Sequence, residues 1–215
     1  KGYAETLSAM PADKTEERER FLAVILRNAD HMSRMVNSLL ALSRWESSQP
    51  GTRTTPVDGR RLADEAAQSL WPQAKATSVR VETDLPPDLP PVDGDEAGLA
   101  DVFRNLLDNA LKYSPQGGVV KVSAAQVKDR VVFRVADQGP GIPQHARDRI
   151  FERFYRVGDG PGKKDGGAGL GLAICRNIVT ALGGSIWVES PPEGEAGSVF
   201  AFDLPVAKTS PEGEG

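Results

Sequence analysis

Two neighbouring segments of the chain, VVKVSAAQV (119–127) and RVVFRVAD (130–137), have the short, alternating and β-branched pattern of strands. Only Lys128 and Asp129 separate them, which predicts a β-hairpin. The segments SIWVES (185–190) and SVFAFDLP (198–205) predict a second hairpin in the same way. A sheet of such hairpins buries one face against a second layer of helices or strands.

The rest of the chain predicts helices that can form the second layer. The intervening sequence indicates helices at about 58–76, at about 95–113 and in the apolar run that follows Gly171, with a further strand at 78–83. This order predicts an α+β fold, a two-layer α/β sandwich in which a mixed sheet packs on helices. The chain has 215 residues, which is enough for one full domain and a smaller element.

The smaller element is a long helix at 16–46. Its apolar seam has the alternating three- and four-residue spacing of a coiled coil, at Phe21, Ile25, Asn28, Met32, Met35, Leu39 and Leu42. Asn28 either sets the register of the seam or lies at a hydrated end of the bundle. Residues before Pro11 resemble the end of an earlier helix, and two such helices bury little alone, so pairing with a second copy of the chain is expected.

Charge and cysteine content exclude some functions. The net charge is −4, which argues against a nucleic-acid partner. The single cysteine, Cys175, lies among apolar residues and predicts a buried thiol in a reducing, cytoplasmic compartment. The sequence contains no apolar run long enough to span a bilayer and no signal peptide.

Three polar side chains share one face of the helix predicted at 95–113. Asn105, Asn109 and Lys112 follow one another at intervals of four and three residues. Amide oxygens suit Mg²⁺, and a lysine one turn further on suits a phosphate. The same pattern is also that of a plain solvated face.

The segment VADQGPGIP (135–143) ends a strand at Asp137 and continues with Gly139 and Gly141. A buried carboxylate there would accept a hydrogen bond from the exocyclic amine of adenine and repel the carbonyl of guanine. A simple turn after a strand would need the same residues.

The segment GGAGLGLAICRNIVTALGG (166–184) sets glycines directly against the start of a helix. Glycines let backbone approach a ligand, and a helix N-terminus attracts phosphate. The alternative is a mobile loop, including the glycine-rich stretch 158–167, that precedes an ordinary core helix. Just upstream, Phe151 and Phe154 could anchor this loop, and Arg153 or Arg156 could reach a terminal phosphate.

Taken together and in this order, the segments NLLDNALKYS, DQGPGIP, FERFYR and GAGLGL resemble the N, G1, F and G2 boxes of the sensor histidine kinases. The resemblance covers 57–206, and SLLALSRWES upstream resembles the second helix of the family's dimerisation hairpin. GYAETL is similar to the first helix of phosphate-regulon-type sensors. The resemblance implies a truncated hairpin at 1–48, a linker at 49–56, an ATP-binding domain of the Bergerat fold at 57–207 and a disordered tail at 208–215.

The resemblance also implies a site for ATP and Mg²⁺. Asn109 would bind Mg²⁺ with Asn105 beside it, Asp137 would read the adenine amine, and Arg156 would meet the γ-phosphate. Asn105, Lys112 and Arg156 would be the catalytic residues. The remaining nucleotide-binding residues would be Lys112, Tyr113, Gly139, Gly141, Gly167, Gly169, Leu170 and Gly171.

The phosphoryl acceptor is the main departure from the family pattern. The family uses a histidine followed by a carboxylate and a proline, and neither His31 nor His145 has this setting. The acceptor is therefore expected upstream of Lys1, in a membrane-anchored parent that forms a homodimer and passes the phosphoryl group to the receiver domain of a response regulator. Two alternatives are a nucleotide-binding scaffold without transfer and an ATPase of the same fold. The ATPase would need a glutamate where Asn105 stands.

Overall fold

The computed structural model of the chain describes residues 54–157, 169–189 and 196–208, together with 15–26 and the single positions Thr6, Ala29, Met32 and Val36. The chain divides into two compact units, Lys1–Ala41 and Leu42–Gly215, and each is considered by itself. Residues 15–26 are helical, in agreement with the first part of the helix predicted at 16–46. Most of the later seam positions, Asn28 among them, lie outside the described residues. Over the described ranges, none of the helices combines the length and hydrophobicity that a membrane crossing requires.

The larger unit is built on a five-stranded sheet with the strand order β2–β4–β5–β7–β6. Its strands are β2 (Arg80–Asp84), β4 (Val119–Val127), β5 (Arg130–Asp137), β6 (Ser185–Glu189) and β7 (Ser198–Pro205). Both predicted hairpins are confirmed, since β4 pairs antiparallel with β5 and β6 pairs antiparallel with β7. Strand β2 pairs parallel with β4, so the predicted mixed sheet is also confirmed.

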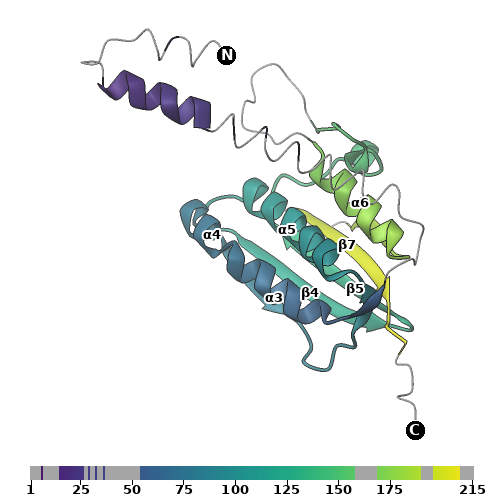
Figure 1. The fold of residues 1–215 in the computed structure, drawn as a ribbon. Helices are drawn as coiled ribbons and strands as arrows, with labels where there is room; N and C mark the ends of the chain where they lie inside the picture. Colours follow the sequence, from purple (N-terminus) through teal and green to yellow (C-terminus); the bar gives the residue numbers. More distant parts are fainter. Residues whose placement is uncertain are drawn as a thin grey trace. The chain divides into compact units, whose positions relative to one another are not determined.

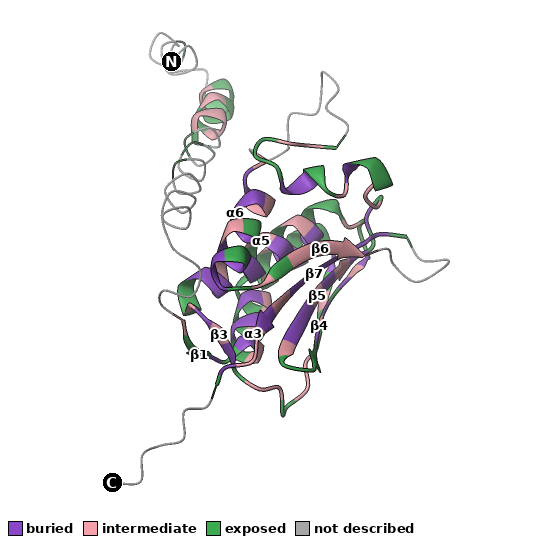
Figure 2. Cartoon of the chain, turned by 90° about the vertical axis from the view of Figure 1, so that its right-hand side faces the viewer, coloured by how far each residue is buried: buried purple, intermediate pink, exposed green. Residues whose placement is uncertain are grey.

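Helices cover one face of this sheet (Figure 1). They are α3 (Gly59–Ser69), α4 (Trp71–Thr77), α5 (Glu96–Tyr113) and α6 (Gly171–Ala181), and two short 3₁₀ turns lie at Gln144–Ala146 and Arg149–Phe151. Helix α5 packs between α3 and α6 across the middle of the sheet. Figure 2 shows buried residues where the helices and strands face each other. The two-layer α/β sandwich is therefore confirmed.

The prediction of one helix at about 58–76 is wrong, because α3 and α4 divide this segment at Leu70. Pro72 lies in the first turn of α4. In the interior of a helix a proline would lose a hydrogen bond and clash with the preceding turn, whereas in a first turn it costs neither. Ser78, in the left-handed region at φ 56°, ends α4, so β2 begins at Arg80 rather than at 78.

Two short strands were not expected from the sequence. β1 (Thr55–Val57) and β3 (Val92–Gly94) pair antiparallel, and β1 begins inside the segment 49–56 predicted as a linker. Val92 also bridges to Val206 just after β7. This small sheet joins the entry of the domain, the start of α5 and the end of the last strand.

Three phenylalanines connect α5 to the centre of the sheet. The Phe103 ring meets Phe133 and Phe202 edge-on, with centroids 5.2 and 5.4 Å apart, and Phe133 stacks on Phe202 at 5.1 Å. All three side chains are fully buried. A Cβ on Gly59 would lie 2.5 Å from Cζ of Phe133, so a glycine lets α3 close over this cluster.

Replacing Phe133 by alanine should lower the free energy of unfolding by about 3–5 kcal/mol, because it opens a cavity at the centre of the core. Urea unfolding measures this loss. The control is Val127→Ala on the half-exposed end of β4, which should change stability by no more than about 0.5 kcal/mol. Equal losses in the two variants would contradict this account of the core.

Candidate functional site

Asp137 ends β5 as a buried carboxylate, with 7% of its surface exposed. Its Oδ1 accepts a hydrogen bond from the backbone N–H of Gly139 at 2.8 Å. Burial raises the pKa of Asp137, while hydrogen bonds from the backbone of Gly139 and Ser198 act in the opposite direction. The position predicted from the sequence is therefore an acidic group at the end of a strand and largely shielded from water.

Gly139 brings the end of α5 next to this carboxylate. A Cβ on Gly139 would lie 2.8 Å from Oδ1 of Asp137 and 2.8 Å from the carbonyl oxygen of Tyr113. Any larger residue would push these two elements apart. The predicted residues Tyr113, Asp137 and Gly139 thus lie together, as the sequence indicated.

Gly197, at the start of β7, also belongs to this end of the sheet, although the sequence analysis did not select it. It has a φ of 126°, and a Cβ there would lie only 1.8 Å from the carbonyl oxygen of Asp137. Gly141 has a φ of 77° and lies close to Gly197. A Cβ on Gly141 would be 3.1 Å from the carbonyl oxygen of Gly197. The one signal in the sequence was a glycine directly before a strand.

A second group of predicted residues lies where α5 meets the start of α6. Asn105 is half-buried, and its Nδ2 donates to the carbonyl oxygen of Asp101 at 2.8 Å. This bond leaves Oδ1 directed at Gly171, whose Cβ would lie 2.9 Å from it. Leu170 precedes the helix and offers no side-chain cap. The first backbone N–H groups of any helix lack an intrahelical partner. This helix start has the chemistry of an anion site.

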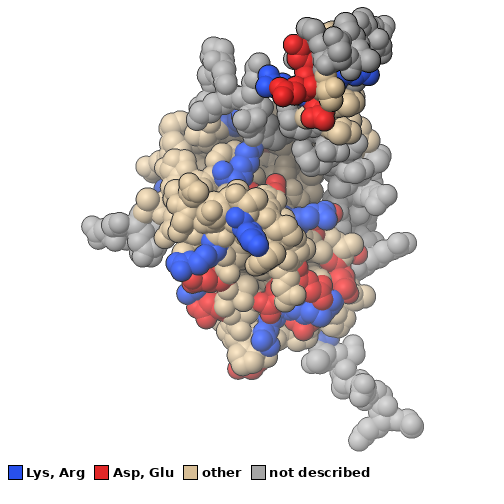
Figure 3. Space-filling view, turned by 90° about the vertical axis from the view of Figure 1, so that its left-hand side faces the viewer, with Lys and Arg blue, Asp and Glu red and all other residues tan. Residues whose placement is uncertain are grey.

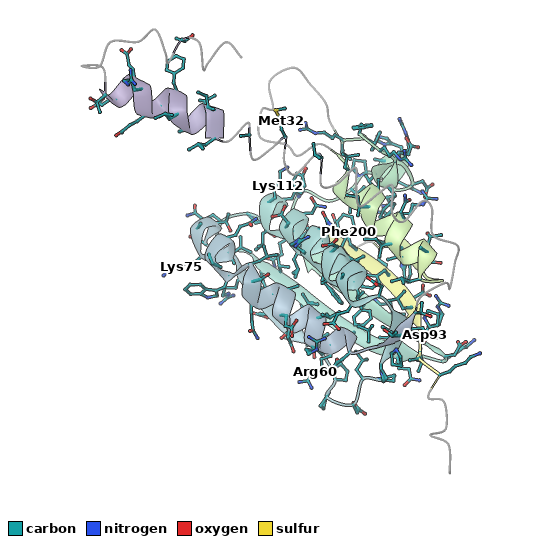
Figure 4. The ribbon with its side chains drawn as sticks, in the orientation of Figure 1. Met32, Arg60, Lys75, Asp93, Lys112 and Phe200 are labelled. Atoms are coloured by element: carbon teal, nitrogen blue, oxygen red, sulfur yellow. The ribbon has the colours of Figure 1, made fainter. Side chains whose placement is uncertain are left out.

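Asn109 and Lys112 lie between these two groups on α5. Asn109 is half-buried, whereas Lys112 and Tyr113 are exposed at the C-terminal end of the helix, where Figure 4 shows Lys112. The Lys112 ammonium lies 5.2 Å from the centre of the Tyr113 ring. In the part of the chain that the structure describes, no three His, Cys, Asp or Glu side chains gather to hold a metal ion.

Phe154 and Gly169 join the segments on either side of 158–168. The Phe154 backbone N–H donates to the Gly169 carbonyl at 2.9 Å, and both residues have positive φ, 63° and 70°. A Cβ on Gly169 would lie 2.9 Å from the Phe154 carbonyl carbon. The two phenylalanines proposed as anchors differ, since Phe151 is buried and Phe154 is 61% exposed. Arg156 follows as a half-buried side chain.

Some predicted positions lie outside the described residues. They are Gly167, the stretch 158–167 and His31. His145 is exposed in a short 3₁₀ turn, as expected for a surface residue. Cys175 is buried against the carbonyl oxygen of Val102, and burial raises the pKa of its thiol, so the prediction of a structural cysteine is confirmed.

A mixed sheet covered by helices on one face, with a buried acid and close-packed glycines at one end, defines the Bergerat class of two-layer α/β sandwich. A family model for the histidine kinase-, DNA gyrase B- and HSP90-like ATPases matches residues 94–208. The chain belongs to this family. The model of the His kinase A (phospho-acceptor) domain matches residues 1–48.

Curated relatives indicate the branch of the family. The chain is 39% identical over 176 residues to the adaptive-response sensory kinase SasA of Gloeothece citriformis, covering 81% of this chain and 44% of the relative. It is 38% identical over 180 residues to the alginate biosynthesis sensor protein KinB of Pseudomonas aeruginosa, covering 82% of this chain and 29% of the relative. The chain thus spans less than half the length of these two relatives. The resemblance to sensor histidine kinases is confirmed.

Solved structures agree with this assignment. Full-length ShkA in complex with AMPPNP superposes with a TM-score of 0.75 at 31% identity, over 90% of this chain and 40% of that one. The mycobacterial sensor histidine kinase MprB superposes with a TM-score of 0.60 at 34% identity, over 71% of this chain and 97% of that one.

Gly197→Ala should destabilise the chain far more than Gly117→Ala. Both glycines have positive φ, but Gly117 has no atom within 4 Å of a built Cβ, so its variant should cost about 1–2 kcal/mol from backbone strain alone. The Gly197 variant must also displace the Asp137 carbonyl, which should add at least about 2 kcal/mol. Urea unfolding of the two variants measures the difference. Similar losses would mean that the close approach at Gly197 is not needed.

Asp137→Asn should remove a pH dependence of stability. Because burial raises the native pKa of Asp137, the folded chain holds this proton more tightly than the unfolded chain, where the pKa is about 3.9. As pH rises above that value, the Asp137 contribution to the free energy of unfolding falls until the native pKa is passed. The variant should therefore gain on the wild type as pH rises. Urea unfolding across a pH series tests this, and a wild type that gains on the variant would contradict it.

Proposed function

We propose that the chain binds ATP with Mg²⁺ and transfers the γ-phosphoryl group to a histidine side chain. One observation carries the proposal: α5 connects the buried carboxylate of Asp137, through Tyr113 and Gly139, with Asn105 beside Gly171 at the start of α6. Asn105 and Tyr113 are separated by about 12 Å along the helix. This spacing supports a site for an elongated ligand that has a base at one end and phosphates at the other.

The Asp137 end fits an adenine base. An ionised carboxylate only accepts hydrogen bonds, so it pairs with the exocyclic amine of adenine and repels the carbonyl that guanine has at that position. Its burial makes an unpartnered charge costly, which sharpens this selection. Gly139 and Gly141 let the backbone pack closely around this carboxylate.

The α6 end fits the phosphates. The first N–H groups of a helix have no partner within the helix, and together with the partial positive charge of the helix N-terminus those of α6 would favour an anion. Lys112 on α5 and Arg156 would add positive charge, with Arg156 at the γ-phosphate. Gly167, Gly169 and Gly171 would let the backbone lie close to the ligand.

Asn105 and Asn109 fit a magnesium ion that bridges phosphate oxygens. Mg²⁺ is commonly held by one or two protein oxygens together with water and substrate phosphates. The Asn105 amide already donates through Nδ2, so its Oδ1 is the atom available as a ligand. The ion would neutralise charge that develops on the phosphates.

The transfer needs a nucleophile but no basic residue from this domain. A neutral imidazole nitrogen of the acceptor would attack the γ-phosphorus in line, while the bond to the β-phosphate oxygen breaks and ADP leaves. Hydrolysis would instead need a group to activate water, and the amide of Asn105 is not a base. This chemistry favours phosphoryl transfer over an ATPase.

The N-terminal unit would form a homodimer. Leu22, Leu26, Met32 and Val36 are exposed large apolar side chains on this unit, a surface that a second copy would cover. The family assignment supports a cytoplasmic role within a longer, membrane-anchored sensor, with an aspartate of a response regulator as the final phosphoryl acceptor.

Asp137→Asn should weaken binding of a non-hydrolysable ATP analogue about 10- to 100-fold, because the new amide donor faces the adenine amine and a charged hydrogen bond is lost. Binding of the GTP analogue, weak in the wild type, should change much less. Calorimetric titration with Mg²⁺ gives both constants, and the unfolding series above shows that the variant is folded. Equal loss for both nucleotides would contradict base recognition by Asp137, and a normal ATP constant without phosphoryl transfer in the full-length parent would favour the scaffold alternative.

A further inference from the structure

The side chain of Gln138 bonds to the backbone of β4 just beyond the point where the β4–β5 ladder stops. Backbone pairing between these two strands begins beside the hairpin turn and ends at Lys121 and Ala136. Two residues further on, the same register would place Val119 opposite Gln138. The Val119 N–H donates there to Oε1 of the Gln138 side chain at 2.9 Å. The accepting atom is the amide oxygen, because a backbone N–H only donates.

This bond replaces one that a regular ladder would make through the main chain. The N–H of Arg80 in β2 donates to the carbonyl of Gly118 at 2.9 Å, so the Gly118 carbonyl is directed at β2. Backbone groups alternate in direction along a strand, and the N–H of Val119 is therefore directed at β5. In a continued antiparallel ladder the main-chain carbonyl of Gln138 would accept this N–H. Because the side chain accepts it, the backbone can leave the sheet directly after Asp137.

The backbone that leaves the sheet turns at once into the adenine end of the proposed site. The next N–H, that of Gly139, donates to Oδ1 of Asp137 at 2.8 Å. A Cβ on Gly139 would lie 2.8 Å from the carbonyl oxygen of Tyr113. Gly197 approaches the same turn, since a Cβ on Gly197 would lie 3.0 Å from Cα of Gln138. The backbone of Gln138 is thus part of this close packing, and its position affects both the carboxylate and the end of α5.

The other partner of the bond, Val119, directly follows the connection from α5 to β4. This connection is already held on the β2 side, because the N–H of Gly117 donates to the carbonyl of Ser78, the residue that ends α4, at 2.9 Å. The bond to Gln138 holds it on the β5 side. The end of α5 and the loop that follows β5 are therefore linked by a side chain as well as by backbone packing.

The link at Gln138 carries no charge, unlike the ion pairs between neighbouring strands. Figure 3 shows basic and acidic side chains interspersed over one face of the molecule. One ion pair joins Lys121 of β4 to Asp84 of β2 at 2.8 Å, and salt screens it because both side chains are exposed. The bond from Val119 to a neutral amide is not screened in this way. Gln138 therefore holds the β5 side of β4 independently of ionic strength.

We propose that Gln138 is a positioning residue of the nucleotide site, an inference that rests on the proposed function. Its side-chain oxygen takes the place of a main-chain carbonyl at the end of the β4–β5 ladder. It thereby fixes the turn through Asp137 and Gly139 against the end of α5, where the adenine would bind. Gln138 acts through these two residues and not through contact with the nucleotide. The turn requires an acceptor oxygen at this distance from the backbone, which glutamate also supplies and leucine does not.

Gln138→Leu and Gln138→Glu form a matched pair, since the first removes the acceptor and the second keeps it at the same length. Calorimetric titration of AMPPNP with Mg²⁺ should show about fivefold weaker binding for Gln138→Leu, because the turn loses its link to β4. Gln138→Glu should keep binding within about twofold of the wild type, because its carboxylate accepts the same N–H. The control Gln116→Leu removes an exposed glutamine from the same α5–β4 connection and should bind as the wild type does.

NMR of the nucleotide-free chain tests the link itself. In Gln138→Leu the amide protons of Val119 and Gly139 should shift and exchange faster with solvent, whereas in Gln138→Glu both should exchange as slowly as in the wild type. An unchanged Gly139 amide in Gln138→Leu, or equal AMPPNP binding by the two Gln138 variants, would overturn this inference. A wild type that binds no AMPPNP would contradict the proposed function, and the amide signals would still decide whether Gln138 positions Gly139.

Discussion

A close approach of backbone to backbone, which only glycine permits, holds the Asp137 end of the sheet together. Gly197, just before β7, lies against the backbone carbonyl of Asp137. A Cβ on Gly197 would be only 1.8 Å from that carbonyl oxygen. Gly139 does the same for the end of α5. Because strand, helix and loop meet within van der Waals contact, the Asp137 carboxylate is held in a buried position, where it accepts the backbone N–H of Gly139.

Helix α5 makes the core and the site parts of one structure. Its apolar side carries Phe103 into the cluster with Phe133 and Phe202, while its polar side carries Asn105, Asn109 and Lys112. Core packing therefore fixes the position of the polar face relative to β5 and α6. In the proposed site, these rigid elements would hold the phosphate-binding side chains in place before the ligand arrives.

The sequence predicted what local chemistry determines. The hairpin boundaries at β4 and β5 follow from a two-residue turn, and Asp137 was found because an acid at the end of a strand is conspicuous. The break at Leu70 was missed because Pro72 is compatible with a helix at its own position and only interrupts the turn before it. Gly197 was missed because its requirement arises from a tertiary contact, and β1 and β3 are too short to carry a pattern.

The central claim is that one ligand spans from Asp137 to the start of α6. The most direct measurement is an NMR titration of the labelled chain with AMPPNP and Mg²⁺. The account predicts that the amides of Gly139 and Gly141 at one end, and of Gly171 with the Asn105 side chain at the other, shift together with a single dissociation constant. A saturable titration that leaves either end unchanged, or no binding by a folded chain, would contradict it.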